Sequence, residues 1–189
     1  MLKINNISKS FGDNVVIKDL SLELPQKGIV CLTGDSGTGK TTFLNIIAKL
    51  YTADSGTVEN TYKRTAYMFQ EPRLIEWLSA LENINIVLGD KKNTLPVAEL
   101  LLQDVELADA RGKLPRELSG GMKQRISLAR TLAYGGDLYL FDEPFNGMDH
   151  DLKFRMLNLI KERCKDALVI LVTHDSDVAE SLKAAQLHF

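Results

Sequence analysis

The segment Gly34-Asp35-Ser36-Gly37-Thr38-Gly39-Lys40-Thr41 has the residue types and the spacing of a phosphate-binding loop, G-x-x-x-x-G-K-[ST]. Its three glycines permit the positive φ angles at which backbone N–H groups converge on phosphate oxygens. We expect Lys40 to reach the β- and γ-phosphates of a nucleotide, and the Thr41 hydroxyl to ligate Mg²⁺. A glycine-rich turn without chemistry is the alternative, but it leaves unexplained why a strand pattern precedes the loop and a helix pattern follows it.

A second apolar segment, Leu138-Tyr139-Leu140-Phe141, ends in two carboxylates, Asp142 and Glu143. A carboxylate at the carboxyl end of a parallel strand, near a phosphate loop, would hold Mg²⁺ through water. The second carboxylate could orient or deprotonate an attacking water. A capping pair for the next helix is the alternative, and it is weakened because Pro144 and a loop intervene.

The elements that must position these groups follow an α/β order. The first 30 or so residues alternate between polar and apolar, which predicts an antiparallel sheet with one face in water. Apolar runs at 29–32, 138–141 and 168–172 predict strands buried on both faces of a parallel sheet. Residues 72–118 are mostly helical by pattern, which indicates an inserted helical subdomain.

Helical spacing recurs three times, each time with apolar residues on one face. The three sets are Phe43, Ile46, Ile47 and Leu50; Met122, Ile126, Ala129 and Ala133; and Leu152, Met156 and Leu159, with Arg163 as the polar end of the last.

Composition excludes several classes of protein. The chain has 189 residues, which allows about one domain. It carries 23 Lys and Arg against 25 Asp and Glu, so no basic excess indicates a nucleic-acid partner. Cys31 and Cys164 lack metal-ligand spacing and favour a reducing compartment. We find neither a secretory h-region nor the ~18 consecutive apolar residues of a membrane helix, and we expect a soluble, cytoplasmic chain.

The segment Leu118-Ser119-Gly120-Gly121-Met122-Lys123-Gln124-Arg125 resembles the LSGGQ signature of ABC-type ATPases, with Met122 where Gln is common. A plain Ser N-cap before a helix is the alternative reading of Ser119. The resemblance extends over essentially the whole chain. Its other landmarks are an adenine-stacking aromatic (Phe11, where Tyr is commoner), the phosphate loop (34–41), the Q-loop glutamine (Gln70), the Walker B carboxylates (Asp142, Glu143), the D-loop (146–149) and the switch histidine (His174).

Taken alone, three of these residues have other readings. Phe11 could be a core aromatic, Gln70 an ordinary polar residue at a strand end, and His174 a structural cap. Their order along the chain, which is that of the family, favours the functional readings. The D-loop reads Asn-Gly-Met-Asp where Ser-Ala-Leu-Asp is frequent, and Gly147 adds backbone freedom there.

The resemblance implies one ABC-type ATPase domain over 1–189, with a P-loop NTPase core, a mostly parallel sheet and an N-terminal antiparallel β subdomain. Residues 1–70 and 135–189 would form the core and β subdomain, and about 71–134 the helical signature subdomain. It implies ATP and Mg²⁺ as cofactors. ATP would be bound by Phe11, Gly34, Asp35, Ser36, Gly37, Thr38, Gly39, Lys40, Thr41, Thr42, Ser119, Gly120 and Gly121; Mg²⁺ by Thr41, Gln70 and Asp142; and the catalytic residues would be Glu143, His174, Gln70 and Lys40.

The family also implies a head-to-tail dimer, formed with a second copy or a similar ATPase, in which each ATP lies between one phosphate loop and the other copy's Ser119-Gly120-Gly121. The Gln70–Trp77 stretch resembles the Q-loops of nitrate, sulfonate and taurine uptake ATPases. It would dock a membrane permease, which would hold the chain on the inner face of the cell membrane. The expected role is to energise solute transport, by import, with a solute-binding protein as a further partner. Two alternatives remain open: a soluble ABC-type ATPase of DNA repair or translation, and a P-loop kinase.

Overall fold

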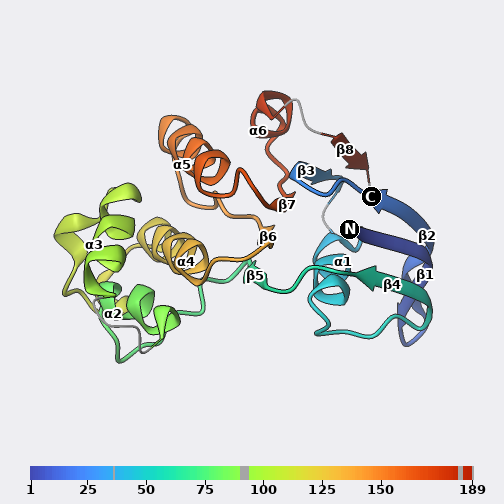
Figure 1. Cartoon of the computed structure of the whole chain (residues 1–189), viewed down its shortest axis with the longest axis horizontal. Helices are drawn as coiled ribbons and strands as arrows, with labels where there is room; N and C mark the ends of the chain where they lie inside the picture. The colour runs from blue at the N-terminus through green and yellow to red at the C-terminus, as the bar shows by residue number, and fades with distance from the viewer. Residues whose placement is uncertain (36, 90–93, 183–184, 189) are drawn as a thin grey trace. The chain divides into compact units, whose positions relative to one another are not determined.

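The computed structural model describes residues 1–35, 37–89, 94–182 and 185–188, the last range by its backbone only. Ser36, expected to bind nucleotide, lies outside the described residues. The chain divides into two compact units (Figure 1). The first unit comprises Met1–Tyr67, Gly136–Asp142 and Cys164–Phe189, and the second comprises Met68–Gly135 and Glu143–Arg163.

The first unit begins with a three-stranded antiparallel sheet in the order β2-β1-β4, formed by β1 (Leu2–Phe11), β2 (Asn14–Leu24) and β4 (Ser55–Asn60). Leu2, Ile4 and Ile7 on β1 are buried, and they share one core with residues of the parallel sheet. The antiparallel sheet predicted from the alternating residues is therefore confirmed.

A five-stranded sheet follows, in the order β5-β6-β7-β3-β8. Its strands are β3 (Gly28–Thr33), β5 (Thr65–Met68), β6 (Leu138–Asp142), β7 (Leu168–Val172) and β8 (Ala185–His188). The pairs β6–β7, β7–β3 and β3–β8 are parallel. Every residue of β6 and β7 is buried, as the continuous apolar runs predicted. Helices α1 (Lys40–Ile47) and α6 (Ser176–Ser181) complete this unit.

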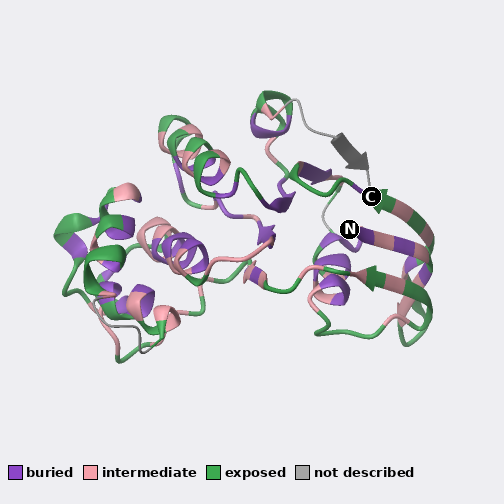
Figure 2. Ribbon diagram, viewed as in Figure 1, coloured by how far each residue is buried: buried purple, intermediate pink, exposed green. Residues whose placement is uncertain are grey.

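The second unit is helical in its described part. It contains α2 (Ala80–Asn85), α3 (Leu95–Asp104), α4 (Gly120–Tyr134) and α5 (His150–Arg163), with short 3-10 turns at Ile86–Leu88, Ala108–Ala110 and Pro115–Glu117. Helices α2, α3 and α4 pack on one another. Figure 2 shows buried residues along their inner sides and exposed residues outside. None of the helices in the described ranges has both the length and the apolar character needed to cross a bilayer.

The helical face predicted after the phosphate loop included one residue, Leu50, that lies outside the helix. Helix α1 ends at Ile47, so Leu50 lies beyond it and is 54% exposed. The end is a Schellman motif, because the N–H of Leu50 bonds to the Asn45 carbonyl and that of Lys49 to the Ile46 carbonyl. Lys49 takes the left-handed position, with φ of 60°. This position is usually occupied by Gly, which marks the end of a helix in a sequence. Because it is Lys here, the sequence did not indicate where α1 ends.

The predicted face of α5 was also partly wrong. Met156 is buried as expected, but its buried companions are Leu157 and Ile160, whereas Leu152 and Leu159 are only partly buried. Positions 156, 157 and 160 also follow a helical period, but they define a face shifted by one residue from the predicted one. A helix with apolar residues on two adjoining faces does not by itself specify which of the two faces its neighbours cover.

Candidate active site

The phosphate loop links β3 to α1 within the first unit. Gly34, Gly37 and Gly39 have φ angles of 140°, 86° and 99°, which L side chains rarely adopt. At Gly39 space is limiting as well, since a Cβ would lie 2.9 Å from the side chain and carbonyl of Val16. Gly39 is also the N-cap of α1, so the first N–H groups of the helix have no partner within it and are free to face an anion.

Lys40 is buried against this loop, with 8% of its surface exposed. Its Nζ donates to the carbonyl oxygens of Gly34 (2.9 Å) and Asp35 (2.5 Å) and to Oγ1 of Thr38 (3.2 Å). The hydroxyl of Thr38 donates in turn to the Asp35 carbonyl, at 3.0 Å. These bonds hold a positive charge at the centre of the loop, where it can contact a phosphate that the backbone N–H groups bind.

Thr41 and Asp142 lie together although they are far apart in the sequence. The Thr41 hydroxyl donates to Oδ2 of Asp142 at 2.8 Å. Asp142 is the last residue of β6 and is 1% exposed. The parallel register explains its position, because Asp142 and Leu32 both pair with Val172, which places the carboxyl ends of β6, β7 and β3 at one level.

The Thr41–Asp142 pair is chemically suited to Mg²⁺, which prefers hard oxygen ligands and is usually held by one or two protein groups together with substrate phosphates. Among the residues in the described ranges, no group of three or more His, Cys, Asp and Glu side chains could hold a metal ion. A site built from these two oxygens would therefore need further ligands from a nucleotide and water.

His174 follows the same edge of the sheet, two residues after β7, which lies between β6 and β3. Its side chain is exposed. The backbone beyond it is held by Asp175, which caps α6 and whose N–H bonds to Oγ1 of Thr173. The sheet thus places His174 at the edge that carries the phosphate loop and Asp142.

Phe11 ends β1 and is 47% exposed, so it is not a core aromatic. Its ring meets that of Tyr51 edge to face, with centroids 5.7 Å apart. Lys9 lies 5.4 Å from the Phe11 centroid, and its Nζ bonds to Asp54 at 2.6 Å. This bond and the N–H of Ser10 lower the pKa of Asp54. The family pattern named Phe11 alone; the neighbouring ring of Tyr51 gave no signal in the sequence.

Thr42, also expected to bind nucleotide, lies in the first turn of α1; the remaining expected residues belong to the second unit. Glu143 follows Asp142 directly and has a left-handed backbone, with φ of 50°. Ser119 is the N-cap of α4, and its hydroxyl accepts the N–H of Met122 at 3.3 Å. Ser119 therefore caps α4, and because its oxygen is the acceptor in this bond, the cap leaves the hydroxyl hydrogen available to a ligand.

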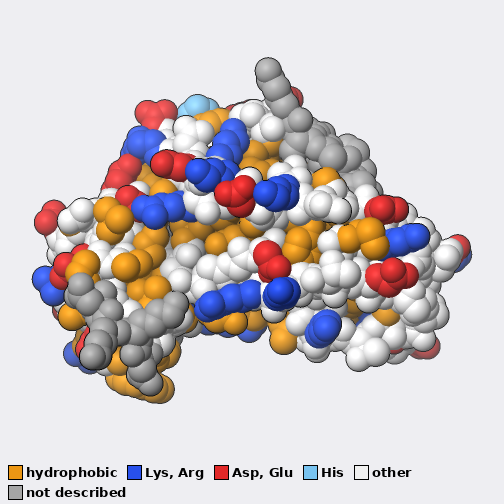
Figure 3. Space-filling model, in the orientation of Figure 1, with side chains coloured by type: hydrophobic (Ala, Val, Ile, Leu, Met, Phe, Trp, Pro, Cys, Tyr) orange, Lys and Arg blue, Asp and Glu red, His pale blue; other side chains and the backbone are white. Residues whose placement is uncertain are grey.

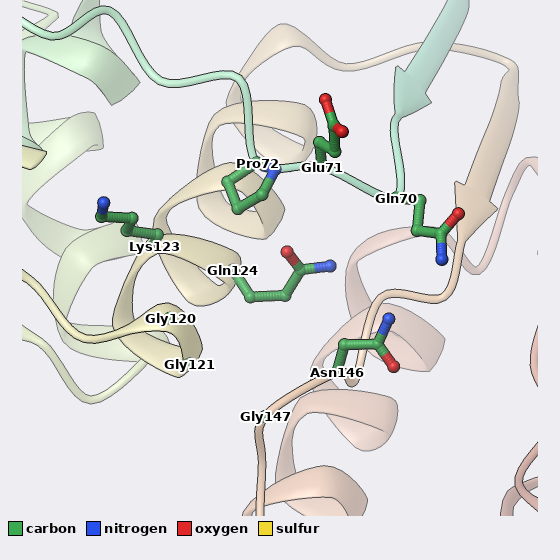
Figure 4. A pocket seen from close by; sticks show the side chains of 9 residues that line it. All are labelled: Gln70, Glu71, Pro72, Gly120, Gly121, Lys123, Gln124, Asn146 and Gly147. Atoms are coloured by element: carbon green, nitrogen blue, oxygen red, sulfur yellow. The ribbon is translucent and has the colours of Figure 1, made fainter.

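Three expected segments of this unit line one cavity of about 560 Å³. Figure 4 shows that its walls come from the Q-loop, the first turns of α4 and the D-loop. The lining residues are Gln70, Glu71, Pro72, Gly120, Gly121, Lys123, Gln124, Asn146 and Gly147. Gly121 is required by space, because a Cβ there would lie 2.4 Å from the carbonyl oxygen of Gly147.

The Q-loop is held rigidly by two residues that no motif indicated. Asn83 of α2 is fully buried, and its side chain bonds to the backbone of Ile75, Leu78 and Ser79. Arg130 of α4 donates to the carbonyls of Pro72 and Arg73, and burial lowers its pKa. Asn83 could have been suspected from the sequence, as a polar residue between apolar ones on the buried face of a short helix.

One face of the protein carries charged side chains of both signs (Figure 3), as expected for a chain with 23 Lys and Arg and 25 Asp and Glu. Figure 3 shows Lys and Arg side chains interspersed with Asp and Glu on the visible face, without a patch of one sign.

Comparison with known proteins places these features in a family. Residues 17–146 match the family described as ABC transporter. The chain is 37% identical to the aliphatic sulfonates import ATP-binding protein SsuB 2 of Burkholderia cenocepacia (strain HI2424), over 95% of this chain and 70% of that protein. It is 36% identical to the macrolide export ATP-binding/permease protein MacB of Campylobacter jejuni (strain 81-176), over 97% of this chain and 32% of that protein.

A solved structure of the ATP-binding cassette MJ0796, a dimer in a post-hydrolysis state bound to ADP and Pi, is similar in fold. Its TM-score is 0.85 at 29% identity, over 95% of this chain and 90% of that one.

Proposed function

The chain belongs to the ABC transporter family, and from that premise we propose that two copies, arranged head to tail, hydrolyse ATP to drive a separate membrane permease. The chain itself is the ATP-binding, ATP-hydrolysing subunit. The sulfonate-import relatives, which are matched over most of their length, favour import. The export protein is matched over only 32% of its own length.

In the proposed mechanism, the phosphate loop binds the triphosphate through its N–H groups, and Lys40 neutralises the β- and γ-phosphates. Thr41 and Asp142 would hold Mg²⁺, which neutralises charge on the phosphates when bound. Phe11 stacks on the adenine. Ser119, Gly120 and Gly121 of the second copy donate to the γ-phosphate through the N-terminus of α4.

Hydrolysis then needs a positioned water. Gln70 would hold the water in line with the γ-phosphate, and Glu143 would accept a proton from that water. His174 would stabilise the charge on the transferring phosphoryl group. Because the γ-phosphate bridges the two copies, its loss would open the dimer, so that ATP acts as a two-state switch.

The observation that carries this proposal is the Thr41–Asp142 hydrogen bond beside a buried Lys40, in a chain that also begins a helix with Ser-Gly-Gly. Glu143→Gln should trap an ATP-bound dimer, because nucleotide still binds but water is not activated. Gel filtration with ATP and Mg²⁺ should show a dimer for this variant. Lys40→Ala, combined with it, should remain monomeric. A Glu143→Gln protein that stays monomeric at saturating ATP would refute the mechanism.

We further propose that the Q-loop docks the permease and so keeps the chain on the cytoplasmic face of the membrane. Trp77 supports this assignment, since it is 79% exposed on a loop that Asn83 and Arg130 hold in place. An exposed aromatic on a preorganised loop is a typical interface anchor.

Co-purification from detergent-solubilised membranes, lost in Trp77→Ala, tests the docking proposal. Recovery with ribosomes or DNA would instead favour a soluble ABC-type ATPase. A phosphorylated small-molecule product, in place of free phosphate, would indicate a P-loop kinase.

A further inference from the structure

The backbone of Glu143 is held in an unfavourable conformation. Its φ of 50° lies in the left-handed region, which residues other than Gly, Asn and Asp seldom occupy. Pro144 follows and further restricts the residue before it. Strain of this kind persists only where neighbouring structure imposes it, and it is concentrated at functional sites.

Gln124 supplies a contact that can impose this conformation. It lies in the first turns of α4 and is 3% exposed, and its Nε2 donates to the carbonyl oxygen of Glu143 at 3.0 Å. The N–H of Asn146 reaches the same oxygen at 3.4 Å, which closes a turn over 143–146. Figure 4 shows the Gln124 side chain extending from α4 toward the side of the cavity where Gln70 and Asn146 lie.

A second contact ties the same two segments together. The Gly147 carbonyl packs directly on Gly121, at the start of α4, with no room for a side chain. The beginning of α4 therefore holds the 143–147 segment at both ends, by a hydrogen bond at Glu143 and by close packing at Gly147.

Gln124 differs in this respect from Thr131, another buried polar residue of α4. The hydroxyl of Thr131 bonds to the Ser127 carbonyl within the helix itself. Gln124 instead directs its amide to the residue expected to activate water. Because the backbone conformation sets the direction of the Cα–Cβ bond, holding the backbone of Glu143 restricts the region that its carboxylate can reach.

We infer that Gln124 is a positioning residue: its amide holds Glu143 in the left-handed conformation and thereby aims the Glu143 carboxylate at the attacking water. The inference rests on the proposed function, in which Glu143 is the general base. Gln124 does not touch the substrate, so its loss should affect the hydrolytic step and leave nucleotide binding unchanged.

Gln124→Met tests this, because Met keeps the length and apolar contacts of Gln and lacks the N–H group. Its kcat for ATP should be about tenfold lower, the factor expected for one lost hydrogen bond, whereas the Kd for ATP should change less than about twofold. Gln124→Leu, which also lacks the donor and introduces no charge, should behave alike if the Met variant folds poorly. Thr131→Val is the matched control: it removes a buried hydrogen bond from the same helix and should leave kcat unchanged.

The combination with Glu143→Gln separates positioning from general destabilisation. Once the carboxylate is gone, adding Gln124→Met should lower the residual kcat no further. A Gln124 variant with wild-type kcat, or one whose kcat falls equally in both backgrounds, overturns the inference and leaves the proposed function intact. A Glu143→Gln protein with wild-type turnover overturns the proposed role of Glu143, and the inference with it.

Discussion

The Asn83 side chain should be among the most important polar groups for the stability of the helical unit. It is fully buried, and its Oδ1 accepts the N–H of Ile75 at 2.8 Å. Its Nδ2 lies 3.0 to 3.1 Å from the carbonyls of Ile75, Leu78 and Ser79. An amide has two N–H hydrogens, so these four contacts amount to about three full hydrogen bonds.

Asn83→Ala removes all of them and leaves the Ile75 N–H without its partner. At about 1 kcal/mol for each hydrogen bond, we expect a loss of about 3 kcal/mol in the free energy of unfolding. That is a large fraction of the total for a domain, which is about 5–15 kcal/mol. Asn85→Ala is the matched control on the same helix, since Oδ1 of Asn85 is buried with no hydrogen-bond partner in the described structure. It should cost less than about 1 kcal/mol.

Urea unfolding followed by far-UV circular dichroism measures both free energies. Trp77 adds a local readout, because it is the one Trp of the chain and lies on the loop that Asn83 holds. Its fluorescence anisotropy should fall in native Asn83→Ala and stay unchanged in Asn85→Ala. Equal unfolding free energies for the two variants, or an unchanged anisotropy in Asn83→Ala, would refute the claim that this amide organises the loop.

Three further outcomes are expected. At pH 8 neither Cys31 nor Cys164 should react with DTNB in the native protein, since both are buried and burial raises the pKa of Cys164 to about 12; rapid labelling would contradict this. Burial tends to raise the pKa of Asp137, but two backbone N–H bonds outweigh it and lower the pKa below 3.8. Its contribution to stability should be complete above that pH and lost as the pH falls below it, and thermal melts of Asp137→Asn should lack that acid dependence. In Gly121→Ala the new Cβ would lie 2.4 Å from the Gly147 carbonyl oxygen, so the variant should form less ATP-dependent dimer in gel filtration while still binding ATP. A normal amount of dimer would show that the backbone at Gly147 can move to accommodate a Cβ.

Much of the fold follows from local pattern. Continuous apolar runs correctly predicted the buried strands β6 and β7, and alternation predicted the antiparallel sheet. The strand-loop-helix order around Lys40 was also correct. These features depend on residues close in sequence, which is the range over which periodicity carries information.

The features that the sequence did not predict depend on contacts between residues distant in the sequence, or on a non-glycine residue with a positive φ angle. Tyr51, in the loop between α1 and β4, meets Phe11 at the end of β1. Gln124 meets Glu143 across 19 positions. Lys49 ends α1 in a conformation normally left to Gly. A one-dimensional pattern cannot show which distant backbone carbonyl a buried amide will meet.

The distribution of the expected site residues between the two units adds a constraint on function. Lys40, Thr41, Asp142 and His174 belong to the first unit, whereas Gln70, Glu143 and the signature residues belong to the second. The boundary therefore falls at the Asp142–Glu143 peptide bond, between the residue proposed to hold Mg²⁺ and the residue proposed to activate water. Within the second unit, Glu143 is bonded to α4, the helix whose first residues are proposed to bind the other copy's ATP. In the proposed dimer, a nucleotide that contacts the start of α4 would therefore act on Glu143 through Gln124, without any change in the phosphate loop. Hydrolysis should consequently be separable from nucleotide binding by mutation: Gln124 variants should affect hydrolysis alone, whereas Lys40 variants should affect both.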